Sequence, residues 1–267
     1  PWSFAGGSYP GTAGTCAATL AAAASCTIVV QFAPTALGVS NDTIDINYND
    51  GASAQTSSRD VTGTGISPAL LTISDSDPYD YSTVASGGGT AQRVFTITNS
   101  GASAATAMSE GGVGAPFNYL GGGYPGTGGD CGLTLGAGAS CTIVVQFTPV
   151  ALGAFADTID FSYNDGAAVQ SSTRDIQGTG GAPASLALSQ SDPYDHLDQA
   201  IGSSTPHLFT LSNAGGVTAV SIADTGALAA PFTFTGAGYP GTNGTCCLLY
   251  TSPSPRDAHE SRMPSSA

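Results

Sequence analysis

Apolar and polar residues alternate over short stretches of this chain, which is the pattern of half-buried strands and not of helices. Residues 157–163 are one such stretch, because Ile159, Phe161 and Tyr163 fall on one face and polar side chains fall on the other. Sustained helical periodicity is found nowhere in the sequence. The pattern therefore predicts an all-β protein whose strands bury one face.

Further strands and turns follow the same logic along the chain. Apolar or β-branched stretches at 69–73, 94–98 and 141–147 predict three more strands, and Asn-Ser-Gly at 99–101 is a turn signal. Asn-Asp-Gly at 164–166 predicts a tight hairpin built from residues with positive φ. Short strands and turns at this spacing indicate a β-sandwich with two packed sheets.

The sequence repeats itself at a constant step of 115 residues. Pro1, Pro116 and Pro231 each begin a similar stretch of sequence, and residues 26–65 are identical to residues 141–180 at most positions. A repeat of this length corresponds to one whole domain, because domains typically contain about 100–150 residues, whereas solenoid units contain about 20–50. We therefore expect tandem copies of one sandwich.

The repeat also predicts domain boundaries. Glycine- and threonine-rich junctions, each followed by proline, lie at residues 63–68 and 178–183. We expect residues 1–67 to be the C-terminal part of one repeat, residues 68–182 a complete repeat, and residues 183–246 the N-terminal part of a third. The complete repeat is expected to fold by itself, whereas the C-terminal piece is not, since its strand edges lack partners.

The last segment, residues 247–267, differs in character from the repeats. Back-translated, it resembles the transposase end and adapter of a tagmentation sequencing library, in frame and in order. We therefore expect this segment to be adapter-derived and disordered, and we exclude it from the fold. The alternative is a disordered tail rich in Ser and Pro. The adapter interpretation predicts a fragment, a reading frame that is cut at both ends.

The charge balance excludes several classes of partner. Charged residues make up only 9% of the chain, with 19 acidic residues against five arginines and a net charge of −14. Binding to nucleic acid requires basic patches that neutralise phosphate, so no nucleic-acid partner is expected. No run of 18 apolar residues is present, so we expect no membrane insertion of this fragment.

Two pairs of cysteines repeat the same ten-residue spacing, Cys16 with Cys26 and Cys131 with Cys141. A zinc site needs four ligands, and a redox couple is expected as C-x-x-C, whereas each repeat offers two cysteines and no repeated histidine. Structural disulfides are the preferred interpretation, pinning the glycine-rich loop at 121–130 to a strand. They favour an oxidising, extracellular setting.

With these elements in place, the repeat resembles the bacterial Ig-like repeats known as choice-of-anchor D domains, which are related to the ASH-like sandwiches of abnormal-spindle and Hydin proteins. The resemblance implies tandem Ig-like β-sandwich domains in large exported surface proteins, and it carries over no catalytic residue. It rests on residues 95–101 and on Cys131, Leu135, Gly138, Cys141, Ile143, Val145, Phe147, Pro149 and Gly153.

One loop carries a candidate metal site. Asp75, Asp77 and Asp80 lie close together near a predicted domain junction, where calcium would rigidify a stalk. Calcium takes six to eight oxygen ligands, and the next repeat replaces Asp75 with Gln190. Turn-forming aspartates with solvated charge are therefore the preferred interpretation. We expect no cofactor, with calcium as the alternative.

Two other motifs recur without pointing to chemistry. Residues 121–126 match G-x-G-x-x-G, but no helix can begin at the Tyr-Pro inside the motif, so a dinucleotide site is not expected. Arg-Asp pairs stand at Arg59-Asp60 and Arg174-Asp175. A ligand-binding arginine is one interpretation, and a solvent-exposed ion pair worth about 0–1 kcal/mol is the preferred one.

Catalytic signals are weak throughout. His196 and His207 have no histidine counterparts in the complete repeat, and no nucleophile, base and acid emerge as a set. We therefore expect a protein that is not an enzyme. The sequence favours a stalk or adhesion array in which neighbouring repeats of the chain are partners and the ligand is an unidentified surface polymer or protein.

The leading alternative is an accessory module, binding carbohydrate or another ligand, of a larger secreted enzyme. An exposed aromatic platform would favour it, and Tyr9, Tyr124 and Tyr239 are the candidates because they stand in equivalent loops. A third hypothesis, an intracellular ASH-like scaffold, is disfavoured by the repeated cysteine pair.

Overall fold

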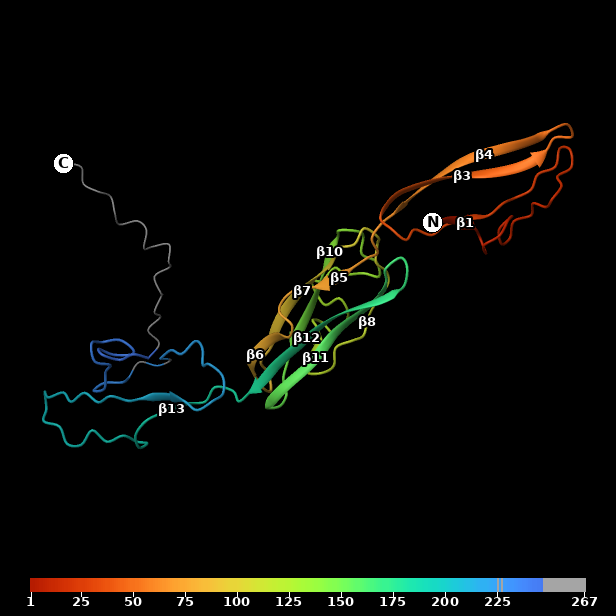
Figure 1. Cartoon of the computed structure of the whole chain (residues 1–267). Coiled ribbons are helices and arrows are strands. Elements are labelled where there is room, and N and C mark those ends of the chain that lie inside the picture. Colours follow the sequence, from red (N-terminus) through yellow and green to blue (C-terminus); the bar gives the residue numbers. More distant parts are fainter. Residues whose placement is uncertain (225, 227, 247–267) are drawn as a thin grey trace, which may run out of the picture. The chain divides into compact units, whose positions relative to one another are not determined.

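The computed structural model describes residues 1–224, 226 and 228–246 (Figure 1). By its contacts the chain divides into two compact units. One comprises Pro1–Asp80, Gln92–Phe147 and Ala156–Gln177, and the other comprises Tyr81–Ala91, Thr148–Phe155 and the residues from Gly178 onward. In the described part of the chain no helix is long and apolar enough to cross a membrane.

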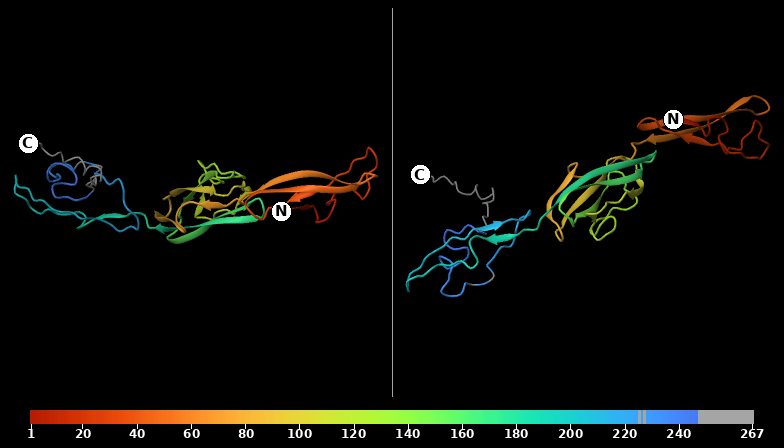
Figure 2. Two further views of the ribbon diagram at one scale, coloured as in Figure 1. Left: turned by 45° about the horizontal axis from the view of Figure 1, so that its top comes forward. Right: turned by 90° about the horizontal axis from the view of Figure 1, so that it is seen from below.

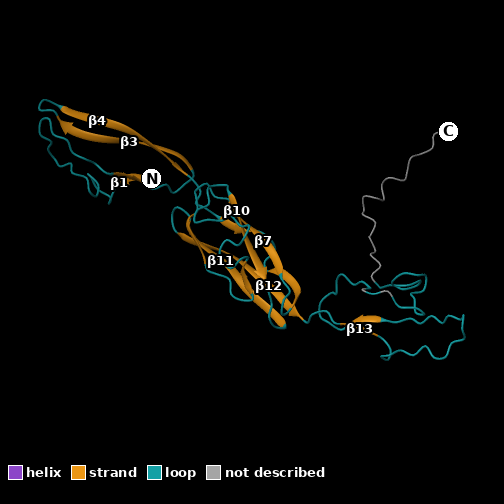
Figure 3. Ribbon diagram, turned by 180° about the vertical axis from the view of Figure 1, so that it is seen from behind, coloured by secondary structure: helices purple, strands orange, loops and turns teal. Residues whose placement is uncertain are grey.

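Eight strands between residues 71 and 181 form two four-stranded sheets (Figures 1 and 3). The first sheet has the order β5-β7-β10-β9 and the second β6-β12-β11-β8. Non-consecutive strands are neighbours in both sheets, which is the topology of an Ig-like β-sandwich. The strands are β5 (Leu71–Ile73), β6 (Tyr79–Ala85), β7 (Ala91–Asn99), β8 (Thr106–Glu110), β9 (Phe117–Tyr119), β10 (Ser140–Phe147), β11 (Gly153–Asn164) and β12 (Val169–Gly181).

This architecture confirms the predicted all-β class of tandem Ig-like β-sandwich domains. The predicted strands at 94–98, 141–147 and 157–163 lie within β7, β10 and β11. The strand predicted at 69–73 begins later, at Leu71, where its pairing with β7 starts opposite Asn99. Figure 2 shows these strands, coloured yellow to green, from two further sides.

The core of the sandwich consists of alternate residues from both sheets. Ile159 and Phe161 are fully buried and Tyr163 is 2% exposed, so the predicted inward face of β11 is confirmed. Burying such a side chain contributes about 1.5–3 kcal/mol. Large side chains that are also fully buried come from the first sheet and the second: Phe95, Ile97, Phe117, Ile143, Val145, Phe147 and Ile176.

The turn between β11 and β12 differs in detail from the expected tight hairpin. Gly166 has a φ of +99°, and it is the one residue of 164–166 with positive φ. The connection is longer than two residues because the Asp165 carboxylate accepts bonds from the backbone N–H groups of Ala167 and Ala168, both at 2.7 Å. This Asx-type turn replaces a two-residue hairpin turn.

The N-terminal segment contains two small antiparallel sheets. β1 (Trp2–Phe4) pairs with β2 (Val30–Phe32), and β3 (Gly38–Asn49) pairs with β4 (Ala54–Gly65). The turn between β3 and β4 repeats the one just described, since Asp50 Oδ1 accepts bonds from Ala52 and Ser53 at 2.8 and 2.7 Å.

The C-terminal segment contains one two-stranded sheet, β13 (Leu186–Leu188) with β14 (Leu211–Asn213). Its pairing of Leu186 with Asn213 matches the pairing of Leu71 with Asn99 in the complete repeat. The boundaries 1–67, 68–182 and 183–246 remain predictions. The interpretation of residues 247–267 as an adapter-derived, disordered segment lies outside the described residues.

Candidate functional site

Disulfides join the cysteine pairs that the repeat spacing singled out. Cys16 is bonded to Cys26 and Cys131 to Cys141, with Cα atoms 4.8 and 4.9 Å apart. Both cysteines of the second pair are buried. Cys246, which follows the same 115-residue step, has a free thiol.

Hydrogen bonds around the second disulfide fix the loop before β10. Asp130 accepts bonds from the backbone N–H and the hydroxyl of Thr142, at 2.6 and 2.8 Å. These bonds, led by the one from the backbone, lower the pKa of Asp130 below its usual range. The disulfide and this carboxylate together hold the loop to the strand.

The glycine-rich loop at 121–127 docks on the same strand. Val144 N donates to Pro125 O at 2.8 Å, and Thr127 N donates to Leu120 O at 2.7 Å. A Cβ at Gly126 would collide with the Val144 carbonyl, and its φ of +89° also favours glycine. The G-x-G-x-x-G match is therefore a docked turn, and no helix follows it.

The loop tyrosine packs inward instead of presenting a flat face. Tyr124 lies edge-on to Tyr119, with ring centroids 5.5 Å apart, and 5.9 Å from the ring of Phe161. Burial raises the pKa of Tyr124, and the Glu110 carboxylate adds to this effect. Tyr9 and Tyr239 are 43% and 36% exposed, and each also lies edge-on to a phenylalanine.

Two of the three aspartates of the candidate calcium loop, Asp75 and Asp77, lie beside arginines. Arg93 forms an ion pair with Asp75, and its Nε donates to Asp75 Oδ2 at 3.3 Å. This hydrogen bond is the main reason that the pKa of Asp75 is lowered. The same guanidinium lies over the Tyr79 ring, 5.2 Å from its centroid, which is a cation–π geometry.

Asp77 forms the second pair of this cluster. Arg174 Nη1 lies 3.4 Å from Asp77 Oδ2, and the backbone N–H of Asp175 donates to Asp77 Oδ1 at 3.0 Å. Arg174 also donates to the Ile73 carbonyl at 2.6 Å. These contacts occupy the carboxylate oxygens that calcium would need. Among the described residues no group of three or more His, Cys, Asp and Glu side chains could hold a metal ion.

The expected exposed pairing of Arg174 with Asp175 is wrong. Successive side chains of a strand point to opposite faces, so neighbours in β12 cannot pair with each other easily. Asp175 instead accepts a bond from the Thr158 hydroxyl at 2.7 Å, while the Arg174 side chain is only 15% exposed. Arg174 therefore cross-links the end of β5 to β12 and is not a surface ligand-binding group.

The side-chain amide of Asn99, which the sequence pattern predicts only as part of a turn, is buried and organises one end of the sandwich. Asn99 is fully buried, and its Oδ1 accepts bonds from the backbone N–H groups of Leu70 and Gly101, at 3.1 and 3.0 Å. Its Nδ2 donates to three carbonyls at 2.9–3.1 Å, those of Ser103, Leu135 and Gly136. The Asn-Ser-Gly pattern at 99–101 signals a turn but does not predict these distant partners.

The C-terminal segment gathers aromatic rings around one tyrosine. The His207 ring stacks on Tyr194 with centroids 4.1 Å apart, and Phe209 lies edge-on to the same ring at 5.2 Å. His196 lies edge-on from another side at 4.9 Å. The two histidines thus act here as packing rings.

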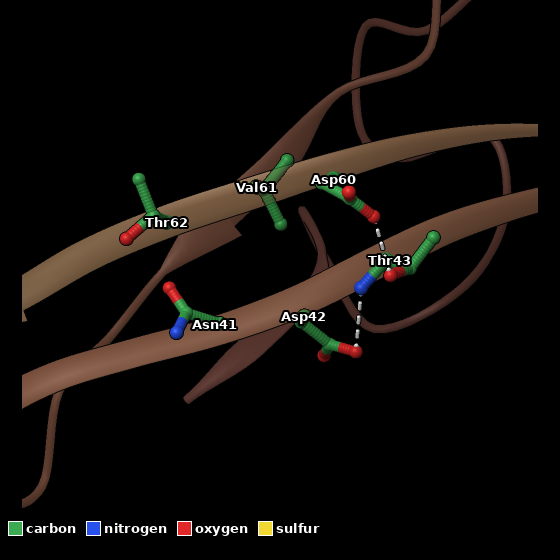
Figure 4. Close-up of a pocket in the computed structure, with 6 residues that line it drawn as sticks. All are labelled: Asn41, Asp42, Thr43, Asp60, Val61 and Thr62. Atoms are coloured by element: carbon green, nitrogen blue, oxygen red, sulfur yellow. Dashed lines mark hydrogen bonds between the residues drawn. The ribbon is translucent and has the colours of Figure 1, made fainter.

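Two shallow hollows accompany these features. One of about 520 Å³ lies on the β3–β4 hairpin, where Figure 4 shows Thr43 bonded to Asp60 and to Asp42. The other, of about 470 Å³, lies beside Tyr163 and Asp165. The Asp165 carboxylate is engaged by its own turn, and those bonds lower its pKa. Neither hollow assembles a catalytic set from the residues that line it.

Comparisons with known proteins address the fold alone. No protein-family model matches the chain, and no curated protein matches it in sequence. A similar solved structure is the ASH/PapD-like domain of human CEP192 (PapD-like domain 7), with 14% identity, a TM-score of 0.31, and coverage of 42% of this chain and 86% of that one.

Two further structures are similar at the same level. The VesB protease of Vibrio cholerae has 20% identity and a TM-score of 0.31; the match covers 42% of this chain and 32%, about a third, of the protease. A protein of unknown function from Porphyromonas gingivalis W83 has 14% identity and a TM-score of 0.32, covering 56% of this chain and 70% of that one. These similarities transfer no activity.

Proposed function

We propose that this chain is a non-catalytic segment of a secreted or cell-surface protein, in which repeated Ig-like modules form a stalk or adhesion array. The Ig-like fold is consistent with a binding or structural domain. The observation that carries the proposal is the repetition of one disulfide-closed loop, through Cys16–Cys26 and Cys131–Cys141, at equivalent positions of successive repeats. Such bonds persist in oxidising compartments.

The side chains that stood out as chemical candidates support a mechanical role. Arg93 and Arg174 are paired with aspartates of their own repeat, and Tyr124 is packed against Tyr119. Groups engaged in this way stiffen the module and leave the exposed loops to vary, which is how loops on a rigid scaffold acquire partners. The partner in this proposal is a surface polymer or protein bound elsewhere in the array.

Surface labelling of intact source cells tests this proposal. An antibody raised against residues 68–182 should label unpermeabilised cells, and brief protease treatment of those cells should remove the signal. A cytoplasmic protein serves as the matched control and should label only after permeabilisation. If the repeats also require permeabilisation, the surface assignment is wrong, and a ligand search inside the cell becomes the next step.

A further inference from the structure

One tripeptide of β3 matches a modification signal. Asn41-Asp42-Thr43 has the form Asn-x-Thr, which is the acceptor sequence for attachment of saccharides to asparagine in secreted proteins. A second tripeptide of this form stands at residues 243–245. Because the pattern is short, the argument for a modification site depends on where the asparagine lies in the fold.

Asn41 lies on the outward face of the β3–β4 hairpin. It stands three positions before Ile44, an odd number of steps, so the two side chains point to opposite faces of the strand. Ile44 is half-buried, whereas Asn41 and its cross-strand neighbour Thr62 are exposed. The acceptor amide therefore lies on the side of the hairpin that faces solvent.

The surroundings of Asn41 leave space for a sugar. Its side chain lines the shallow hollow of about 520 Å³ on this hairpin. In Figure 4 hydrogen bonds join Thr43 to Asp60 and to Asp42, whereas none joins the Asn41 amide to the other residues drawn. A saccharide on this amide keeps both of these bonds, and its hydroxyl groups face carboxylates that accept hydrogen bonds.

The complete repeat shows that this position stays at the surface of a closed sandwich. The residue one 115-residue step later is Ala156 of β11, which is exposed although Ile159 of the same strand is fully buried. The tripeptide Ala156-Asp157-Thr158 differs from Asn41-Asp42-Thr43 only in its first residue. Exposure here is thus a property of the sandwich, and of these two equivalent positions only the first carries the acceptor asparagine.

We propose that Asn41 is a glycosylation site, an inference that rests on the proposed export of the chain. The donor is a saccharide carried on a polyprenyl diphosphate, and an oligosaccharyltransferase of the exporting cell transfers it. Asn41 Nδ2 forms a bond to the anomeric carbon as the bond from that carbon to the phosphate oxygen breaks. The polyprenyl diphosphate leaves with the electron pair of the broken bond, and one amide proton passes to a base of the transferase.

Pairing of the hairpin sets the time at which this transfer takes place. In the folded chain Asn41 pairs with Thr62 and Thr43 pairs with Asp60, and the Thr43 hydroxyl donates to Asp60 Oδ1 at 2.8 Å. A transferase that binds this tripeptide therefore meets it before β3 and β4 pair. For this reason the test uses chain that living cells synthesise and export, and not folded chain added to the enzyme.

The test is the intact mass of the full chain exported by eukaryotic cells, with Asn243→Gln in every protein so that one acceptor tripeptide remains. Treatment with peptide-N-glycosidase should lower the mass of the parent by one oligosaccharide and convert Asn41 to aspartate, which peptide mass spectrometry locates. Asn41→Gln and Thr43→Val should show no such change. Thr43→Ser should retain the saccharide, because serine also fits the acceptor sequence.

Two further variants test whether the position in the fold matters. Asn47→Gln is the matched control, because Asn47 is exposed on the same face of β3 and belongs to no acceptor tripeptide; it should leave the saccharide in place. Ala156→Asn completes the same tripeptide on β11 and should add a second oligosaccharide to the chain.

The disulfides distinguish failure of this proposal from failure of the proposed function. An exported chain that contains the bonds Cys16–Cys26 and Cys131–Cys141 but no saccharide at Asn41 would overturn the glycosylation site and leave the surface assignment standing. A saccharide that persists in Asn41→Gln, or one that appears in Ala156→Asn while Asn41 stays bare, would also overturn it. Failure of the surface labelling of source cells would count against the proposed function instead.

Discussion

Removing the buried amide of Asn99 should destabilise the complete repeat more than any surface substitution. In Asn99→Ala, Leu70 N, Gly101 N and Ser103 O lose the partner that Asn99 supplies. The Leu135 and Gly136 carbonyls each keep a second donor, Ala105 N at 2.9 Å and Ala139 N at 3.2 Å. An unsatisfied buried polar group costs about 1–3 kcal/mol. Gly101 is buried, whereas the bonds of Leu70 N and Ser103 O are only partly buried, so water replaces part of what they lose and we expect a loss of about 2 kcal/mol.

The chain contains its own control for this experiment. Asn213 makes three of the five equivalent bonds in the C-terminal segment, accepting from Ser185 N and Gly215 N at 3.0 and 2.9 Å and donating to Val217 O at 2.8 Å, but its side chain is exposed. Water replaces these partners in Asn213→Ala, so the loss should stay below about 1 kcal/mol.

Hydrogen exchange, followed by mass spectrometry on the full chain, measures the loss of stability in both variants. Peptides covering β5 and β7 should exchange faster in Asn99→Ala by a factor that corresponds to about 2 kcal/mol of opening free energy, while Asn213→Ala should leave them unchanged. Equal effects of the two substitutions, or a loss below about 1 kcal/mol in Asn99→Ala, would refute the reasoning that burial makes this network important.

Three further predictions use the same chain. Replacing Cys131 and Cys141 together by serine opens a loop with a sequence separation of 10 residues. The free energy of unfolding, measured by urea titration, should fall by about 2.7 kcal/mol. The control Cys246→Ser should leave this free energy unchanged, and an equal loss in both proteins would contradict the prediction. Arg174→Met should lower the free energy of unfolding by about 1–2 kcal/mol, because the Ile73 carbonyl and Asp77 lose a charged donor. The control Arg59→Met, at an exposed residue, should have little effect. Similar urea midpoints for the two variants would count against the cross-linking role of Arg174. The pKa values of Asp75, Asp130 and Asp165 are all lowered in the folded protein. Their stabilisation is therefore present above the unfolded pKa of about 4 and is lost as pH falls through the lower folded pKa values. Urea midpoints should drop between pH 7 and pH 3, and they should drop less in Asp130→Asn; a midpoint that does not depend on pH would show that these bonds contribute nothing.

The strands could be predicted because their information is local. Ile159, Phe161 and Tyr163 alternate with polar residues, and one face of a sheet requires this period of two. The docked loop was partly predictable too, since the cysteine spacing recurs in both repeats. The short strands β8 and β9 carry too few residues for any pattern to be distinguished from a turn.

The contacts of the candidate site could not be predicted in the same way. Arg174 meets the Ile73 carbonyl across 101 positions of sequence, and Tyr163 meets Leu71 across 92. Local alternation places Arg174 on a face of its strand but does not say which loop lies beside that face. The sequence neighbour Asp175 was therefore the natural candidate and the wrong one.

The loop that contains Asp75 can be compared with its counterpart in the next repeat, which shows which of its contacts recur. Asp75 and Gln190 occupy equivalent positions with φ near +75°, at 74° and 77°. The alignment of β14 with β7 through their terminal asparagines places His207 opposite Arg93. The ion pair of Asp75 and Arg93 is thus replaced in the next repeat by Gln190 and His207.

The aromatic contact beneath this pair remains. Arg93 lies over Tyr79 in one repeat, and His207 stacks on the equivalent Tyr194 in the next. In both repeats a phenylalanine lies edge-on to the tyrosine, at 5.3 and 5.2 Å. A packing contact needs only a flat partner for the ring, and both the guanidinium and the imidazole supply one. The aromatic contact of the loop is therefore kept in both repeats, while the charge beside it changes from an arginine and an aspartate to a histidine and an amide.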